Sequence, residues 1–246
     1  MVFNHNVVNQ ILDAIFPLPE EFGVVAYEND APDLQWEYDL YKRIWTIDEK
    51  ASIYYGMSKL VIISPEVGDV VIKIPFNGSY EYVYKDDYDE EDDDNYNDDE
   101  YEWAPFHYAP GSDQSDYCLA EYEKFQALKT LHLDCFVAKT FLYKVCCGVR
   151  VFIQEKVSSI EDCYDDHRPS KQSQDLARKI KREKFVSLDT DWLANCLDAY
   201  KQSKLDKFIT YCHKVDYNIL SDLHCGNYGY RKNGTPVILD YSDFLG

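Results

Sequence analysis

Apolar and polar positions follow two periods along this chain, one typical of helices and one typical of strands. Residues 7–15 carry apolar side chains at helical spacing, and the predicted helix ends before Pro17 and Pro19. Residues 117–131 repeat the helical spacing farther along, with an apolar stripe on one face. The members of that stripe are Leu119, Tyr122, Phe125 and Leu128.

Runs rich in β-branched and aromatic residues predict strands on both sides of the second helix. Two runs precede it, at residues 58–64 and 69–74, with turn residues between them. Two more follow it, at residues 136–143 and 149–157. A hairpin formed by Tyr228 to Tyr230 and Val237 to Leu239 lies close to the end of the sequence.

The remaining pattern is helical and polar. Residues 161–184 predict a loop or an exposed helix with a basic stretch, and residues 188–213 predict one or two helices. The order of strands, helix, strands and helices predicts an α+β fold. We divide the chain into an N-terminal extension (1–44), a sheet-containing part (45–157) and a helical part that ends in the hairpin (158–246).

A long acidic insert interrupts the sheet-containing part at about residues 77–116. Within it, residues 86–102 hold twelve Asp or Glu and no Lys or Arg, and this stretch cannot bury enough apolar surface to fold alone. The whole chain carries a net charge of −20, which leaves −8 once these twelve are set aside. The net charge of −20 disfavours direct binding to a nucleic-acid backbone, whereas −8 is an ordinary value. The insert is interpreted as a solvated loop, or alternatively as a phosphate-mimicking surface for a basic groove on a host protein.

The cysteines and the hydropathy pattern indicate in which cellular compartment the protein is expected. Eight cysteines form no CxxC pair, which favours reduced thiols over disulfides or zinc ligands. No apolar run approaches ~18 residues, so neither a membrane span nor a membrane partner is predicted. The first ten residues lack the pattern of a signal peptide. We therefore expect a cytoplasmic protein.

Residues 216–246 gather oxygen-bearing side chains at the mouth of the predicted hairpin. Asp222 is followed five positions later by Asn227, and Asp240 follows thirteen positions after that. Phosphoryl transfer from a magnesium nucleotide needs such a set. One carboxylate serves the attacking hydroxyl, and an amide and a second carboxylate serve the metal.

This stretch resembles the catalytic end of the protein-kinase-like superfamily. Asp222 and Asn227 have the spacing of its catalytic loop, and Asp240 falls where the aspartate of its Asp-Phe-Gly element falls. The sequence motif DLHCGN is similar to that of aminoglycoside phosphotransferases, atypical kinases and small phage kinases. Tyr241-Ser242 replace Phe-Gly, so the usual activation loop is not expected. The resemblance covers residues 45–246 without the acidic insert.

The resemblance implies a protein-kinase-like two-lobed fold with a truncated second lobe. Residues 45–157 would form the first lobe, and residues 158–246 a minimal second lobe with the catalytic hairpin. It also implies ATP and Mg²⁺ as cofactors. Asp222 would accept or orient the proton of the substrate hydroxyl, while Asn227 and Asp240 would be ligands of magnesium.

Lys73, in the apolar run VVIKIPF, adds to the resemblance. A buried ammonium group is costly unless it is paired. In the resembled family a strand lysine of this kind holds the α- and β-phosphates and pairs with a helix glutamate. Glu121 and Glu123 are the candidates; Glu121 shares a helix face with Phe125 and is favoured, and Glu123 stays open. The alternative is a lysine on the solvent face of a half-buried strand.

Two further nucleotide contacts follow from the resemblance alone. Family members carry several glycines between their first strands, whereas this chain has Gly56 with Ser58 two residues later, which an ordinary turn explains equally well. The run VFIQEKV takes the place of the segment that meets adenine, so backbone groups from Glu155 to Val157 are expected there. His224 is interpreted as a brace of the catalytic loop rather than a catalytic base.

These features favour a minimal, atypical kinase-like phosphotransferase of a bacterium or a phage. It would bind Mg-ATP and transfer the γ-phosphate to a hydroxyl of a protein or a small molecule. A catalytically inactive kinase-like interaction protein is the second hypothesis, favoured by the sparse glycines. The third is an acidic decoy, in which the insert binds a host partner.

Overall fold

The protein is a mixed α+β structure, which confirms the α+β part of the expected fold. The computed structural model describes residues 1–18, 26–28, 31–33, 35–55, 59–75, 82–84, 101–103, 116–159, 168–184, 188–215, 218–221 and 223–241. Three residues with predicted roles, Gly56, Ser58 and Asp222, lie outside the described residues, and so does most of the acidic insert.

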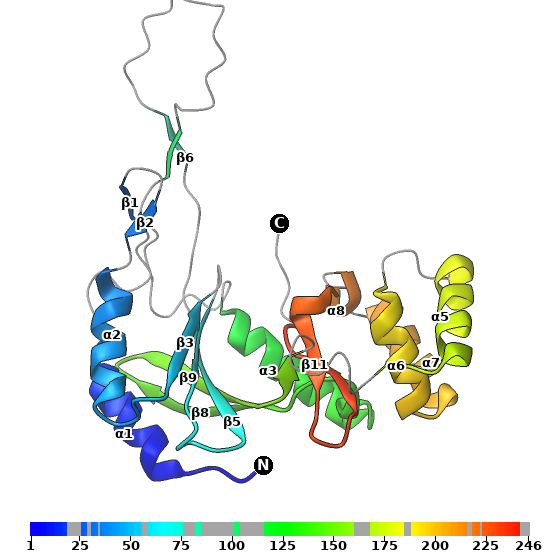
Figure 1. The fold of residues 1–246 in the computed structure, drawn as a ribbon, viewed down its shortest axis with the longest axis horizontal. Helices are drawn as coiled ribbons and strands as arrows, with labels where there is room; N and C mark the ends of the chain where they lie inside the picture. The colour runs from blue at the N-terminus through cyan, green and yellow to red at the C-terminus, as the bar shows by residue number, and fades with distance from the viewer. Residues whose placement is uncertain are drawn as a thin grey trace, which may run out of the picture.

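A five-stranded antiparallel sheet forms the centre of the first half of the fold, beside the blue helices in Figure 1. Its strand order is β3-β4-β5-β9-β8. Val61 pairs with Lys73, and Lys73 pairs with Phe152, so the lysine occupies a central strand. The strands are β3 (Ser52–Tyr55), β4 (Lys59–Ile63), β5 (Val70–Pro75), β8 (Thr140–Cys146) and β9 (Val149–Glu155).

Two helices from the segment expected as an extension pack on this sheet. They are α1 (His5–Ile15), whose first turn is capped by the Asn4 side chain, and α2 (Gln35–Trp45). Their apolar faces and the sheet share one hydrophobic cluster, here called the sheet core. The helices α1 and α2 of the segment 1–44 therefore contribute to this core. The sheet core includes Val8, Ile11, Leu12, Ile15, Leu40, Ile44, Ile53, Leu60, Ile62, Val70, Ile72, Ile74, Val149, Val151 and Ile153.

Helix α3 (Tyr117–Thr130) crosses between the sheet and the second half of the fold (Figure 1). The predicted helix is confirmed, but its buried face differs from the predicted stripe. Phe125 and Leu128 are buried as expected, whereas Leu119 and Tyr122 are only half-buried. The fully buried Glu121 takes part of that face, because α3 meets the sheet through a charged contact as well as apolar ones.

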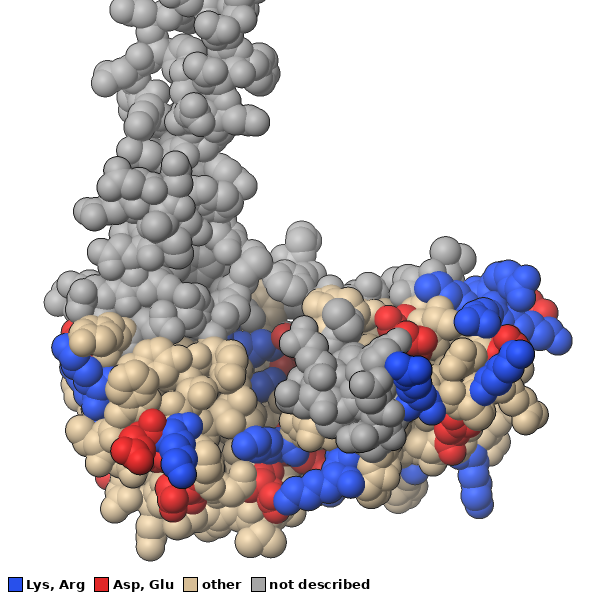
Figure 2. Space-filling model, viewed as in Figure 1, with Lys and Arg blue, Asp and Glu red and all other residues tan. Residues whose placement is uncertain are grey.

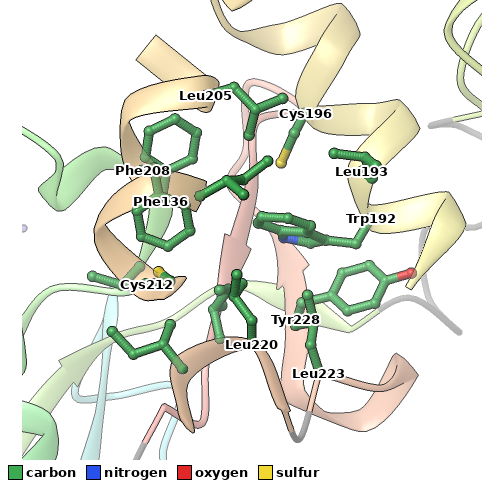
Figure 3. Packing of buried hydrophobic residues seen from close by; sticks show 14 of the residues in the cluster. Phe136, Trp192, Leu193, Cys196, Leu205, Phe208, Cys212, Leu220, Leu223 and Tyr228 are labelled. Carbon is green, nitrogen blue, oxygen red and sulfur yellow. The ribbon is translucent and has the colours of Figure 1, made fainter. Parts of the chain in front are cut away.

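The second half of the fold is mainly helical. Its cluster, here called the helical core, centres on Phe136, Trp192 and Phe208, with the rings of Phe136 and Phe208 stacked at 4.4 Å (Figure 3). Phe141 of β8 packs against both cores. The helices are α5 (Lys171–Lys184), α6 (Thr190–Ala199), α7 (Gln202–Val215) and α8 (Asn218–Ser221). They confirm helices within 188–213, and an exposed helix within 161–184.

The predicted C-terminal hairpin is confirmed as β11 (Tyr228–Tyr230) and β12 (Pro236–Ile238). The short strand β10 (Ser158–Ser159), which follows the sheet, pairs with β11. Gly229 allows this pairing, because a Cβ atom there would collide with the Ser158 carbonyl. The hairpin thus joins the helical core to the chain leaving β9.

The strand expected at 136–143 begins four residues late. Residues Asp134–Phe136 form a 3-10 turn, here η3, and β8 starts at Thr140. Before β8, the carbonyls of Cys135 and Val137 accept hydrogen bonds from the Arg231 side chain, and Val137 forms only an isolated bridge with Ile238 of β12. Phe136 is instead buried in the helical core.

Two small antiparallel pairs complete the described elements: β1 (Ala26–Glu28) with β2 (Ala31–Asp33), and β6 (Tyr82–Tyr84) with β7 (Tyr101–Trp103). The second pair brackets the acidic stretch. Six cysteines in the described part have free thiols. No described helix is long and apolar enough to span a membrane.

Candidate functional site

A cavity of about 220 Å³ lies between the sheet and the C-terminal hairpin. Strands β4 and β5 provide one wall, and Asn227, Leu239 and Asp240 provide the opposite wall. The chain leaving β9, at Glu155 to Val157, closes one side. Figure 2 shows basic and acidic side chains together in the recess between the two halves of the molecule.

Strand alternation decides which side chains reach this cavity. Lys59, Val61 and Ile63 are two residues apart in β4, so they share one face. Val71 and Lys73 occupy the same face of β5 and line the same cavity. Residues of the opposite face, such as Leu60 and Ile72, belong to the sheet core. The cavity therefore has an apolar portion under the strands and a polar portion at Lys59 and Lys73.

Lys73 and Glu121 form a buried ion pair. The Lys73 Nζ lies 2.8 Å from Glu121 Oε2 and 3.1 Å from Oε1. Lys73 is 4% exposed and Glu121 is 0% exposed, which argues against a lysine on a solvent face. Glu121, the favoured candidate, makes this contact, whereas Glu123 is an exposed residue of the same helix.

The first turn of α3 fixes where Glu121 stands. The Asp116 carboxylate caps the helix by accepting the Leu119 N–H at 2.8 Å, and it also contacts Arg150 at 3.2 Å. Burial raises the pKa of the Asp116 carboxyl above its ordinary value despite these bonds. Glu121 lies one turn beyond the cap, on the face toward β5.

Lys59 is a second ammonium group at the same carboxylate. Its Nζ lies 2.7 Å from Glu121 Oε1 and 2.8 Å from Asp240 Oδ2, and the residue is 7% exposed. Burial acts to lower the pKa of Lys59, but Glu121 and Asp240 outweigh it and raise that pKa above its usual range. The lysine is therefore charged, and it links the helix acid to the hairpin acid across the cavity.

Gln154 of β9 completes the network around Glu121. Its side-chain amide donates to the Leu239 carbonyl and the Thr140 hydroxyl, each at 3.0 Å, and lies 3.2 Å from Glu121 Oε2. The Lys73 ammonium also reaches the Leu239 carbonyl, at 3.4 Å. Leu239, the residue before Asp240, is thus held by side chains from β5 and β9.

Tyr241 anchors the other side of Asp240. Its hydroxyl donates to the Ala138 carbonyl at 2.7 Å and shares a hydrogen bond with the Thr140 hydroxyl, also at 2.7 Å. Burial raises the pKa of the Tyr241 phenol well above its usual value, so it stays protonated. Where the resembled family has phenylalanine, this chain has a hydroxyl that ties the hairpin to the start of β8.

Asn227 and Asp240 are held together by the backbone. The Asn227 carbonyl accepts the N–H of Leu239 at 2.7 Å and that of Asp240 at 3.4 Å. Both residues line the cavity, Asn227 being 9% exposed and the Asp240 side chain 30%. His224 caps the 3-10 turn Cys225–Asn227 by accepting the Gly226 N–H at 3.1 Å. This contact supports its interpretation as a brace.

The donor set here fits magnesium better than a soft metal. An amide oxygen and a carboxylate are oxygen ligands of the kind Mg²⁺ takes, with waters completing its shell. Among the described residues, no group of three or more His, Cys, Asp or Glu side chains is arranged to hold a metal ion. If an ion binds here, Asn227 and Asp240 are the residues that would hold it, with waters and ligand oxygens as its other ligands.

The side of the cavity expected to meet adenine is braced by Arg231. Its guanidinium binds both carboxylate oxygens of Glu155, at 2.8 and 2.9 Å, and the carbonyls of Cys135 and Val137. Burial acts to raise the pKa of Glu155, yet the Arg231 hydrogen bonds and charge lower it. The Glu155 side chain is thus engaged by Arg231, and Val157, two residues on, lines the cavity.

The structure brings five of the predicted residues to one cavity: Lys73, Asn227, Asp240, Glu155 and Val157. Glu121 lies directly behind them, bonded to Lys73. Sequence reasoning missed Lys59 and Gln154. Lys59 shares the alternation of Val61 and Ile63, but its position diagonal to Lys73, two residues from Val61, the partner of Lys73, depends on the register between β4 and β5, which the sequence does not specify.

Comparison with known proteins gave no matching family model, no matching curated protein and no matching solved structure.

Proposed function

We propose that this protein is an atypical kinase-like phosphotransferase that binds Mg-ATP in the cavity between its sheet and its C-terminal hairpin. The observation that carries the proposal is the chain of charges Lys73–Glu121–Lys59–Asp240, in which the first three are buried and Asp240 is partly exposed, and which runs from the sheet to the hairpin along the cavity. The protein-kinase-like two-lobed fold belongs to the same proposal. It is supported by the presence of two hydrophobic cores with the cavity between them.

Stability alone is a poor explanation for this cluster. Burying an ion pair removes two charges from water, and a well-packed apolar pair of similar size is often at least as stable. Here two ammonium groups and a fully buried glutamate lie behind an open cavity. Charged groups concentrated in a cleft are typical of binding and catalytic sites.

The two portions of the cavity suit the two portions of a nucleotide. Val61, Ile63 and Val71 offer an apolar surface to a flat ring, next to the backbone at Val157. The ammonium group of Lys73, held in place by Glu121, offers a fixed positive charge to phosphate oxygens. In this proposal the ring lies toward β9 and the phosphates lie toward the hairpin.

The transfer step would depend mainly on positioning and charge. Magnesium, when bound, would neutralise charge on the transferred phosphate. Asn227 and Asp240 would hold the ion, and their shared backbone bonds fix their spacing. The role of Asp222 as acceptor of the hydroxyl proton rests on its five-residue spacing from Asn227. The acceptor hydroxyl belongs to a protein or a small molecule.

The first test is the thermal shift of the purified protein with ATP, with and without magnesium. A ligand at 100 times its Kd stabilises the native state by about 2.7 kcal/mol, so a magnesium-dependent rise in Tm is expected. Asp240→Asn should lose the magnesium-dependent part of the rise. Asp175→Asn, on the exposed face of α5, is the matched control and should keep it.

Three outcomes separate the hypotheses. No shift at millimolar ATP in the wild-type protein contradicts a nucleotide site. A magnesium-dependent shift without transfer to any acceptor, unchanged by Asp222→Asn, supports the inactive kinase-like interaction protein instead. Turnover abolished by Asp222→Asn, with the ATP-induced shift retained, supports the enzyme. The acidic-decoy hypothesis depends on residues outside the described part and rests on the sequence alone.

A further inference from the structure

Lys59 stands where the expected phosphate loop meets the sheet. It is the first residue of β4 and directly follows the segment 56–58, where the resemblance expects a glycine-rich turn. Its side chain lies on the same face as Lys73, and both ammonium groups line the cavity. A phosphate placed here has two lysines within reach, on neighbouring strands of one sheet.

The balance of charge around Lys59 depends on Asp240. Glu121 has one negative charge, and its carboxylate contacts two ammonium groups, those of Lys59 and Lys73. The second positive charge is balanced by Asp240, 2.8 Å from Lys59. Once Asp240 turns to a magnesium ion, Lys59 loses that counterion inside the cavity. The single charge of Glu121 would then face two buried ammonium groups, which is costly, so an anionic group of the ligand would take the place of Asp240.

We propose that Lys59 is a second phosphate-binding cation of this cavity, held by Asp240 in the ligand-free protein and transferred to the ligand's phosphates when Asp240 takes the metal. This inference rests on the proposed nucleotide site. A lysine side chain here supplies the positive donors that backbone amides supply in a glycine-rich loop. It makes binding depend on the number of phosphates, whereas a purely structural lysine would affect all ligands equally.

The test compares Lys59→Met with wild type by calorimetric titration with adenosine, AMP, ADP and ATP, each with magnesium. A hydrogen bond to a charged group is worth about one to two powers of ten in affinity. We expect Lys59→Met to weaken ATP binding about 10- to 100-fold and to leave adenosine binding unchanged. Lys59→Arg should retain most of the ATP affinity, because it keeps the charge.

Two further variants keep the result interpretable. Lys144→Met removes a lysine of β8 that contacts Asn9 and Asp13 away from the cavity, and it should bind every ligand as wild type does. Lys59→Gln keeps a donor toward Glu121 without the charge and replaces the methionine variant if that one does not fold. It should show the same dependence on phosphate number.

The possible failures are distinguishable. If wild type binds Mg-ATP and Lys59→Met binds it equally well, the role of Lys59 is overturned and the proposed function stands. The same conclusion follows if Lys59→Met weakens adenosine and ATP by the same factor, because the lysine then acts only on structure. If wild type binds none of the four ligands, both proposals fail together.

Discussion

The buried carboxylate of Glu121 gives the sharpest test of the charged cluster. It accepts hydrogen bonds from Lys59 and Lys73 at 2.7–3.1 Å and is 0% exposed. Glu121→Gln keeps the shape of the side chain but removes the charge and turns an amide N–H₂ toward an ammonium group. Removing one partner of a buried ion pair costs about 3–5 kcal/mol. Asp240 still balances Lys59, so the uncompensated charge is mainly that of Lys73 and the cost falls toward about 3 kcal/mol.

The assay is urea unfolding followed by circular dichroism, with a thermal melt beside it. For a chain of this size about 1 kcal/mol corresponds to a 2–4 °C change in Tm, so a fall of about 6–12 °C is expected. Glu123→Gln is the matched control on the same helix, and its exposed side chain predicts a change within about 0.5 kcal/mol. Adding Lys73→Met to Glu121→Gln should recover stability, because it removes the cation that lost its partner.

Equal stabilities of Glu121→Gln and Glu123→Gln would refute this reasoning. A double variant less stable than Glu121→Gln alone would also refute it. The first result would mean that the two lysines find solvent or other acceptors at little cost. The second would mean that Lys73 contributes through packing of its aliphatic stem rather than through its charge.

Two other predictions concern the residues that hold the hairpin. Arg231→Met should destabilise the protein by about 3 kcal/mol in urea unfolding at pH 7, because it removes the guanidinium that binds the half-buried Glu155 carboxylate. Arg231→Lys should recover little of this stability, because lysine lacks the planar fork of N–H donors. The folded-state pKa of Glu155 lies below its usual 4.5, so this contribution is complete above pH 4.5 and is lost as the pH falls through the folded pKa. A wild-type advantage over Arg231→Met that does not shrink with acidification below pH 4.5 would contradict the assignment. Tyr241→Phe should cost about 1–3 kcal/mol in the same assay, since Ala138 and Thr140 lose a buried partner; an unchanged midpoint would mean that a water replaces the hydroxyl.

Local pattern predicted the elements well where one periodicity dominated. The spacing of Val8, Ile11, Leu12 and Ile15 predicted α1, and all four side chains are buried. The alternation in 69–74 placed Lys73 opposite the apolar face of β5, as the structure has it. The hairpin at Tyr228 was predicted to within a residue, because its strands are short and flanked by turn residues.

What the sequence could not supply was the pairing between distant segments. Residues 136–139 look like strand, yet side chains about a hundred positions away take the carbonyls of Cys135, Val137 and Ala138. The buried face of α3 was predicted partly wrong, because a glutamate there is stabilised by two lysines that only the strand register brings together. Gln154 was missed for the same reason: its partners come from α3, β8 and the hairpin.

Two sets of contacts join the hairpin to the sheet at the cavity, one made by Arg231 and one made by Lys59. At the back, Arg231 joins the hairpin to the end of β9 and to the residues before β8, and the Tyr200 hydroxyl lies within hydrogen-bonding distance of both Cys135 and Pro236 carbonyls. None of these bonds would have to break when a nucleotide enters. At the front, the proposed exchange breaks the ion pair between Lys59 and Asp240 and replaces it with contacts from Lys59 to the ligand. The contacts of Arg231 thus hold the two cores in the same orientation with and without a nucleotide. In the proposal, the bound state differs locally, because the Lys59 ammonium contacts the phosphates of the ligand instead of Asp240.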